Sequence, residues 1–394
     1  MSHQNGLEQW TGIVSRQMPQ LSQSQARVLA LYSFGVVVMR SSGMRTLSVF
    51  LGALLGRKEN SVRQQLREFC YDAPDKRGQA RQEVDITACF GFLVAWVLSW
   101  WDSEERHLAI ALDATSLGQR FSVLALSIVY RGCAIPVAWA IVPGTQSTSW
   151  RWHWEGLLDC LAGYMPAGWT VVVLADRGLY AKWLFQHIVR LHWHPFLRIN
   201  QQGHFRLRHS TTFQSLKTVV AQDGCARQLE IVCFKTPQAQ LSCTLLAQWS
   251  AQYEDPWLIL TDLAPSQASV TWYGLRAWIE AGFKDLKRGG WHWQKTAMTD
   301  PARAERLWLV LSVATLWVLS VGGQADRADS AAGFDAPLLP PSPSPALPAR
   351  PRLLSCFTRG IALILAALLR ADPCPFGRFV PDPWPAIPDY VPIL

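Results

Sequence analysis

The spacing of hydrophobic residues changes near residue 106 and divides the chain into two parts. Before this point hydrophobic positions recur at helical intervals, which predicts helices at 25–39, 44–55, 60–69 and 86–101. The third helix, which Asn60 or Ser61 could cap, is polar and carries Arg63 and Arg67. Residues 1–105 are therefore predicted to form a helical N-terminal domain.

The polar third helix has two interpretations. Two short helices followed by a basic one can form a helix-turn-helix, which would place Arg63 and Arg67 in a major groove of DNA. An ordinary solvent-exposed helix has the same composition, so both interpretations stay open. The first makes residues 1–105 a DNA-binding domain.

From residue 107 onward the pattern is typical of strands. Apolar runs at 107–113, 121–130 and 134–142 are expected to pair as consecutive antiparallel strands. A helix is predicted next, followed by a strand that is apolar at nearly every position, as in strands buried on both faces. A further helix and strand complete this series, so that the later elements occupy 149–164, 169–176, 180–191 and 195–199.

This order predicts an α/β protein with a ribonuclease H-like core. A right-handed crossover can lay the first and fourth strands side by side. Asp113 and Asp176 are predicted to end these two strands at the same edge of the sheet. Their carboxylates could then converge within the distance at which two ligands bridge a metal ion. Each aspartate alone is a weak signal, because aspartates often end strands as turn caps.

The remaining segments suggest an insertion, a covering helix and a tail. Strand-like runs at 201–262 lie between Asp176 and Glu280, and this separation is longer than a compact connection needs. We therefore expect a β-rich insertion there, within a catalytic domain of 106–200 and 263–322. The apolar helix of this domain, which opens at 300–306 and runs to 321, is expected to cover the sheet. Residues 323–352 are rich in Pro, Ser and Ala and are predicted to be a linker. The C-terminal helix and tail at 353–394 either mediate dimerisation or pack on the body.

Composition indicates a globular protein with a polyanionic partner. The chain has 394 residues, 49% of them hydrophobic and 17% charged, and a formal net charge of +8. Its nine cysteines include no C-x-x-C pair, which argues against a disulfide framework or a zinc site. The N-terminus lacks the pattern of a secretory signal, so a cytoplasmic protein is expected. Walker-type and serine-nucleophile motifs are absent.

Three apolar segments raise a membrane alternative. They lie at 86–101, 307–321 and 353–369 and are shorter than the roughly 20 residues that span a bilayer. Buried helices of a large core explain them more simply. We therefore expect no membrane partner, and a membrane protein is the less favoured alternative.

Four polar residues form the most specific pattern in the chain. Tyr273, Arg276, Glu280 and Lys287 stand at relative positions 0, 3, 7 and 14. On a continuous helix, about 100° per residue places them within roughly 60° of one another. Large apolar residues fall in other directions and could pack on a core, and the pair at 289–290, both glycines, could end the helix. A solvent-exposed amphipathic helix also collects charges on one face.

The pattern resembles the YREK signature of bacterial DDE transposases of the insertion-sequence-four family. Asp113 in Ala-Leu-Asp-Ala-Thr and Asp176 in Ala-Asp-Arg-Gly-Leu are similar to the Asp-x-Thr and Asp-x-Gly blocks of that family. The resemblance spans roughly residues 107–321. It implies that Asp113, Asp176 and Glu280 bind the catalytic metals, that Tyr273, Arg276 and Lys287 hold phosphates, and that the insertion is β-rich. Lys284 shares their face by geometry alone.

The resemblance also implies cut-and-paste transposition of an insertion sequence. Strands are cleaved at inverted-repeat ends, the freed 3′-hydroxyl attacks the opposite strand to give a hairpin, and the reopened end enters target DNA. Phosphodiester displacement of this kind uses two divalent metals about 4 Å apart. Hard oxygen ligands select Mg²⁺ or Mn²⁺, and Asp113 is the expected bridge between them.

Hairpin formation requires a base to leave the stack, which an aromatic ring commonly compensates. Trp249 and Trp257 in the insertion are the candidates. The expected partners are double-stranded DNA, as transposon ends and target, and a second copy of the chain in a synaptic homodimer at the bacterial nucleoid. The alternative is a catalytically inactive, sequence-specific DNA-binding relic of a transposase; the intact Asp, Asp, Glu set favours the active enzyme.

Overall fold

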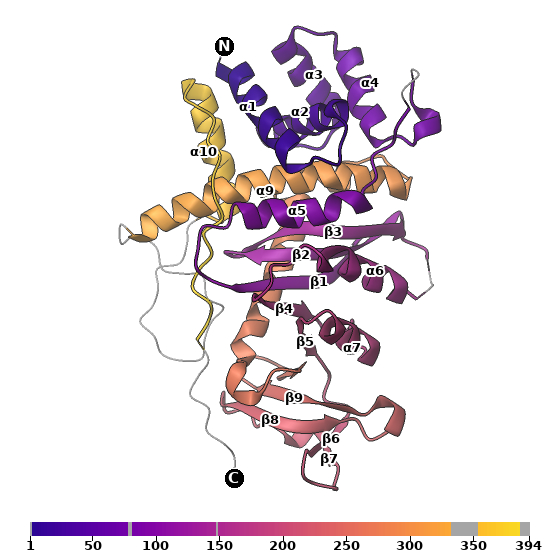
Figure 1. Cartoon of the computed structure of the whole chain (residues 1–394), viewed down its shortest axis with the longest axis vertical. Coiled ribbons are helices and arrows are strands. Elements are labelled where there is room, and N and C mark those ends of the chain that lie inside the picture. Colours follow the sequence, from indigo (N-terminus) through magenta and orange to yellow (C-terminus); the bar gives the residue numbers. More distant parts are fainter. Residues whose placement is uncertain (1, 78–80, 147–148, 332–353, 387–394) are drawn as a thin grey trace.

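The fold is a mixed α/β arrangement built around one large sheet. The computed structural model of the chain describes residues 2–77, 81–146, 149–331 and 354–386. Helices of the N-terminal region lie at one end of the long molecule, and the later strands lie at the other end (Figure 1). Ten described strands form a single sheet in the order β3-β2-β1-β4-β5-β10-β9-β8-β6-β7.

The N-terminal region is helical, as predicted, with one helix more than the sequence pattern indicated. The additional helix, α1, precedes the four predicted ones. An N-terminal cap at Ser22 starts the second helix, where Gln25 completes a capping box. The predicted caps of α4 are wrong: its N-cap is Lys58, which makes no side-chain capping bond. The helices are α1 (Ser2–Gln17), α2 (Gln23–Met39), α3 (Met44–Leu55), α4 (Glu59–Cys70) and α5 (Thr87–Ser99).

The centre of the sheet has the predicted order of elements. β1 pairs antiparallel with β2 and parallel with β4, and β4 pairs parallel with β5. Strand positions in this part are almost all buried, because helices cover both faces. The elements are β1 (His107–Leu117), β2 (Phe121–Tyr130), β3 (Cys133–Pro143), α6 (Arg151–Ala162), β4 (Thr170–Ala175), α7 (Lys182–Arg190) and β5 (His194–Arg198).

One boundary in this part differs from the prediction. Asp113 does not end its strand, because β1 continues to Leu117 along β2. The pairing of β1 with β4 nevertheless stops at Leu112 and Ala175. The edge that carries Asp113 and Asp176 is therefore set by the shorter strand β4.

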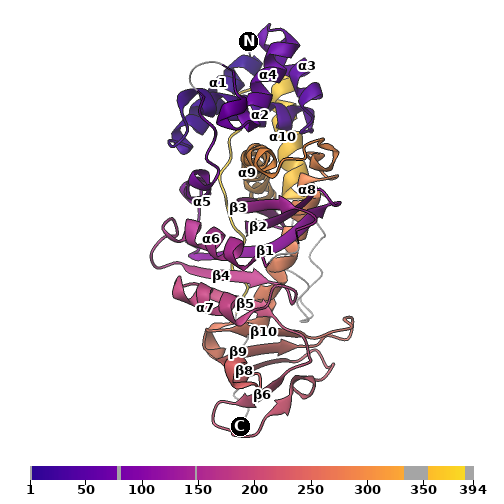
Figure 2. The same cartoon turned by 90° about the vertical axis from the view of Figure 1, so that its right-hand side faces the viewer.

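The strands of the predicted insertion continue the same sheet (Figure 2). β10 pairs antiparallel with β5 and so joins the strands of the predicted insertion to the central strands. The division into a catalytic domain and an insertion stays a prediction. These strands are β6 (His204–Leu207), β7 (Gln214–Ser215), β8 (Ala226–Cys233), β9 (Leu241–Gln248) and β10 (Trp257–Thr261). Short 3-10 helices lie at η1 (Ala73–Asp75), η2 (Leu216–Thr218), η3 (Pro237–Ala239), η4 (Pro265–Gln267), η5 (Val270–Ala277) and η6 (Trp293–Lys295).

A long apolar helix, α9 (Pro301–Ala331), lies between the N-terminal helices and strand β3 (Figure 1). It continues into the segment predicted as a linker, where the carboxylate of Asp326 is fully buried and pairs with Arg359 at 2.8 Å. The rest of that segment, 332–352, lies outside the described residues. Within the described part, α9 alone has the length and apolarity of a membrane span, and 94% of its apolar window is buried in the protein.

The C-terminal region packs on the body of the same chain. Helix α10 (Cys356–Arg370) lies so close to α9 that a Cβ atom on Gly360 would stand 2.0 Å from the carbonyl oxygen of Val318. The chain then runs back along the sheet, where Asp382 forms an ion pair of 2.5 Å with Arg131 in the turn between β2 and β3. Dimerisation through this region stays a prediction.

Candidate active site

Strand pairing brings Asp113 and Asp176 to one edge of the sheet. Leu112 pairs with Ala175, and Ala175 in turn pairs with Leu197 of β5. Asp113 is the next residue on β1, and Asp176 directly follows the last residue of β4. The two carboxylates therefore occupy adjacent positions along one row of the sheet.

The segment with the four-residue pattern is not one continuous α-helix, which corrects the prediction. Tyr273 and Arg276 lie on the 3-10 helix η5, Glu280 lies on α8 (Trp278–Leu286), and Lys287 follows the end of α8 with ψ of −122°. The tighter 3-10 turn aligns residues three apart, so Tyr273 and Arg276 share one side of η5. The helix also ends before the glycines at 289 and 290. The apolar positions of the segment are buried as expected: Trp272, Leu275, Ile279, Phe283 and Leu286.

A single guanidinium group contacts all three candidate carboxylates. Nη2 of Arg276 lies 2.8 Å from Oδ2 of Asp113 and 3.5 Å from Oδ2 of Asp176. Nη1 of Arg276 lies 2.5 Å from Oε1 of Glu280, one helical turn further along. The structure thus brings Asp113, Asp176 and Glu280 around one cation.

The second oxygen of each aspartate is held by the backbone. Oδ1 of Asp113 accepts a hydrogen bond from the N–H of Ala114 at 2.8 Å. Oδ1 of Asp176 accepts from the N–H groups of Gly178 and Leu179 at 2.9 and 3.2 Å. Each carboxylate is therefore fixed through one oxygen and presents the other to the shared cation.

Burial and charge act against each other at this site. Burial raises the pKa of Asp113 above its ordinary value, the guanidinium of Arg276 opposes the rise, and the neighbouring carboxylates add to it. Burial alone would lower the pKa of Arg276, but Asp113 and the other acidic neighbours outweigh this effect and raise it. Arg276 therefore stays charged, with 13% of its side chain exposed.

The chemistry of these ligands suits a hard divalent cation. Three carboxylates each present an oxygen to one positive group, and such oxygens are what Mg²⁺ and Mn²⁺ prefer. With Arg276 in its present position, the described residues contain no set of three or more His, Cys, Asp or Glu side chains arranged to hold an ion. A divalent cation would use the same carboxylate oxygens that Arg276 contacts.

Lys287 lies beside the continuation of β1. Its ammonium donates to Oγ1 of Thr115 at 2.6 Å and to the carbonyl oxygen of Ser116 at 2.9 Å. No ion pair of Lys287 with a carboxylate occurs among the described residues, and burial lowers its pKa. A partly buried cation held by neutral oxygens is suited to receive an anion. Lys284 is exposed on α8.

Tyr273 is buried, and burial raises its pKa to about 12. Its ring stands edge-on to Trp257, with centroids 5.4 Å apart. Trp257 also stacks on Tyr253 at 6.1 Å. Trp249 instead donates its indole N–H to the carbonyl oxygen of Tyr253. Of the two base-flipping candidates, Trp257 is the one that contacts Tyr273.

The sequence analysis missed Arg198. It follows Leu197 on β5, so it continues the row of Asp113 and Asp176 onto a third strand. Its charge opposes the burial that raises the pKa of Tyr273, and its Nη2 donates to the carbonyl oxygen of Pro256 at 3.2 Å. The available signal was its position at the end of a predicted strand that leaves the sheet at the same edge.

Arg63 and Arg67 lie on α4, away from the carboxylates. Arg67 is exposed and lines a cleft of about 680 Å³ between the N-terminal helices and the loop that follows α8. Further cations in its wall are Arg45, Lys295 and Arg303. Contact of α4 with DNA stays a prediction.

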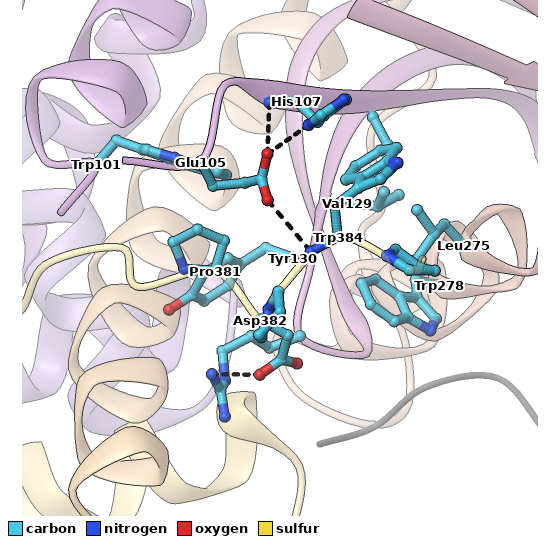
Figure 3. A pocket seen from close by; sticks show the side chains of 14 residues that line it. Trp101, Glu105, His107, Val129, Tyr130, Leu275, Trp278, Pro381, Asp382 and Trp384 are labelled. Carbon is cyan, nitrogen blue, oxygen red and sulfur yellow. Dashed lines mark hydrogen bonds and ion pairs between the residues drawn. The ribbon is translucent and has the colours of Figure 1, made fainter. Parts of the chain in front are cut away.

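A more enclosed pocket lies at the other end of β1 (Figure 3). His107 and Glu105 line it, together with Trp384 of the C-terminal segment. Because a strand rises about 3.3 Å per residue, His107 is roughly 20 Å from Asp113 along β1. This pocket is separate from the carboxylate site.

An α/β sheet with three acidic side chains converging at one edge suits an enzyme that acts on phosphate esters. The family model described as transposase DDE domain matches residues 106–317, which is more than half of the chain and includes all three acids. The chain belongs to this family and is a DDE transposase, with DNA as its partner. No curated protein matches it.

Proposed function

We propose that Asp113, Asp176 and Glu280 are the catalytic carboxylates of a ribonuclease H-like transposase of the insertion-sequence-four family. The observation that carries the proposal is their convergence on Arg276 from β1, from the end of β4 and from α8. These acids lie far apart in the sequence and come from three different elements of the fold. The order of the five central strands supports the ribonuclease H-like assignment.

The carboxylates would hold two Mg²⁺ or Mn²⁺ ions, with Asp113 as the ligand shared between them. When bound, these ions stabilise the oxygens that attack and leave phosphorus. The backbone hydrogen bonds to Asp113 and Asp176 fix the ligands before DNA arrives. This preorganisation lowers the cost of assembling the site.

The reaction would be cut-and-paste transposition through a hairpin. Water attacks phosphorus at the transposon end, and the P–O3′ bond breaks to leave a 3′-hydroxyl and a 5′-phosphate. The 3′-oxygen then loses its proton and attacks phosphorus in the opposite strand, which closes the hairpin and releases the 3′-oxygen of the flanking DNA. A second hydrolysis reopens the hairpin, and the same 3′-hydroxyl joins target DNA.

Cations around the site would hold the phosphates of that DNA. Lys287 lies beside Thr115, further along β1 than Asp113, and Arg198 continues the row of the two aspartates on β5. Tyr273 of η5 meets Trp257 of β10 edge-on. Lys284 would add a contact from the exposed side of α8. For the extruded base we favour Trp257 over Trp249, because Trp257 contacts Tyr273.

The partners would be transposon ends, target DNA and a second copy of the chain in a synaptic complex. Arg63 and Arg67 would bind the duplex from α4. A net charge of +8 supports a polyanionic partner. The site of action would be the bacterial nucleoid in the cytoplasm.

Strand cleavage tests this proposal. A linear DNA that carries the element's own ends is incubated with the protein and either Mg²⁺ or EDTA, and the products are resolved under denaturing conditions. We expect Mg²⁺-dependent nicks and hairpins from the wild type. Glu280→Gln should lose both products and still bind the ends, whereas Glu8→Gln, the same change at an exposed position of α1, should cleave normally. End binding without cleavage by the wild type would instead indicate a DNA-binding relic.

A further inference from the structure

We propose that Arg276 is an internal counter-ion that occupies the place of the metal and competes with divalent cations for the three carboxylates. This inference rests on the proposed function, since it takes Asp113, Asp176 and Glu280 as the metal ligands. It adds that metal ions bind well only after Arg276 has moved away. Metal loading and DNA binding are thereby coupled through one side chain.

The contacts of Arg276 are those of a bridging cation. Nη2 lies between Asp113 and Asp176, and Nη1 holds Glu280, so the two terminal nitrogens together reach all three acids. Both aspartates offer it the oxygen that the backbone leaves unused. A metal bound to these ligands would need the same oxygens.

Among the described residues, Arg276 is the cation that neutralises the three carboxylates. Three carboxylates face one guanidinium, and the described residues include no other cation that forms an ion pair with any of them. Lys287 is held by Thr115 and Ser116, and Arg198 by Pro256. Without Arg276, the three negative charges would repel one another at close range.

Arg276 also keeps an unused donor that suits another partner. Within the described residues its Nε is buried and has no hydrogen-bond acceptor. A buried N–H without an acceptor costs free energy, so the present position of Arg276 leaves one of its donors without a hydrogen bond. A phosphodiester can accept from Nε and one Nη together, in the bidentate geometry that arginine prefers. DNA therefore offers Arg276 a contact that the free protein lacks.

Coupling follows because the two ligands act on the same group. A phosphate that draws Arg276 away exposes three oxygens for metal, and a metal on those oxygens frees Arg276 for phosphate. By thermodynamic linkage each ligand raises the affinity for the other. The free protein should therefore bind metal weakly.

Calorimetric titration of Mn²⁺ into the DNA-free full-length chain tests the inference. Arg276→Gln removes the charge and should bind Mn²⁺ at least about tenfold more tightly than the wild type, which corresponds to roughly 1.4 kcal/mol. Arg27→Gln makes the same substitution at an exposed position of α2 and should leave the affinity within about twofold. Adding Asp113→Asn to Arg276→Gln should abolish the gain.

The outcomes separate this inference from the proposed function. Equal, carboxylate-dependent binding by the wild type and Arg276→Gln would overturn the competition and leave the metal site standing. Binding by neither protein would overturn both. Should Arg276→Gln unfold in metal-free buffer, the inference requires Mn²⁺ to restore its folding, and failure to do so would contradict it. Arg276→Lys keeps the charge but cannot reach three acids, so its affinity should fall between those of the wild type and Arg276→Gln.

Discussion

Asp113 and Asp176 are neighbours in one row of the sheet, because each directly follows a residue of the last parallel pair, Leu112 and Ala175. The pairing register alone sets this relationship. A slip of one residue would turn one carboxylate to the opposite face of the sheet. β4 is buried on both faces, so such a slip would require the closely packed side chains on both sides of the sheet to repack.

Replacing Gly178 by alanine should disturb Asp176 specifically. An added Cβ would stand 3.3 Å from Oδ1 of Asp176, the oxygen that accepts the N–H of Gly178. A small displacement of that carboxylate should lower the cleavage rate about tenfold while DNA binding persists. Single-turnover cleavage at saturating DNA measures the rate. Gly156→Ala is the control, because a Cβ atom meets nothing within 4 Å there; equal rates for both variants would contradict the prediction.

Replacing Lys287 by methionine should weaken DNA binding without loss of stability. The ammonium is partly desolvated and has neutral partners, so its removal relieves a cost rather than breaking an ion pair. If Lys287 holds one phosphate, the slope of log K against log salt should decrease by about 1. Fluorescence anisotropy at several salt concentrations measures the slope, and thermal unfolding measures the stability. A slope unchanged from the wild type would assign Lys287 a purely structural role.

Much of the architecture followed from the hydrophobic pattern. Strands β1 to β5 and helices α2 to α7, α9 and α10 could be predicted because apolar runs at period 2 or 3.6 leave little choice of element. The acids Asp113, Asp176 and Glu280 could be singled out from their motifs. Helix α1 was missed, since its hydrophobic positions are few and widely spaced.

The arrangement of side chains within the site could not be predicted. The spacing of Tyr273 and Arg276 fits either a 3-10 or an α-helical turn, and packing against β4 and β10 favours the former. The contact of Arg276 with three distant acids depends on tertiary structure that no local pattern encodes. Arg198 went unnoticed for the same reason, because its row becomes visible only once β4 and β5 are paired.

The pH dependence of stability should include a contribution from Glu305 on α9. Burial raises its pKa from 4.5 to about 7, although the N–H of Ile141 donates to its carboxylate. Because the folded pKa lies above the unfolded one, the contribution to stability is full below pH 4.5 and is lost as the pH rises through 7. Glu305→Gln stays neutral and can still accept from Ile141.

Glu305→Gln should therefore be more stable than the wild type at pH 8, by about 1–2 kcal/mol after allowance for partial solvent screening. At pH 5 the two proteins should unfold alike. Chemical denaturation at both pH values measures the difference in the free energy of unfolding. Glu8→Gln on α1 serves as the exposed control. A difference that is the same at pH 5 and pH 8 would rule out titration of Glu305 as its source.

The C-terminal segment supports the helix that carries Arg276. Trp384 stacks on His107 with ring centroids 5.0 Å apart (Figure 3). It also meets Trp272 of η5 edge-on at 5.4 Å. The indole N–H of Trp272 donates to the carbonyl oxygen of Pro385 at 2.9 Å. Trp272 directly precedes Tyr273 in the sequence, so the segment fixes one side of η5.

Trp384→Ala should accordingly lower both stability and the rate of cleavage. Loss of a partly buried indole should cost about 2 kcal/mol of unfolding free energy. A loosened η5 should misplace Tyr273 and Arg276, so cleavage at saturating DNA should fall even under conditions where the variant remains fully folded. Trp384→Phe keeps an aromatic ring against His107 and should recover most of the rate. Leu369→Ala, at an 85% exposed position of α10, should change neither property. Destabilisation of Trp384→Ala with an unaltered rate would show that the segment stabilises the fold without positioning the site.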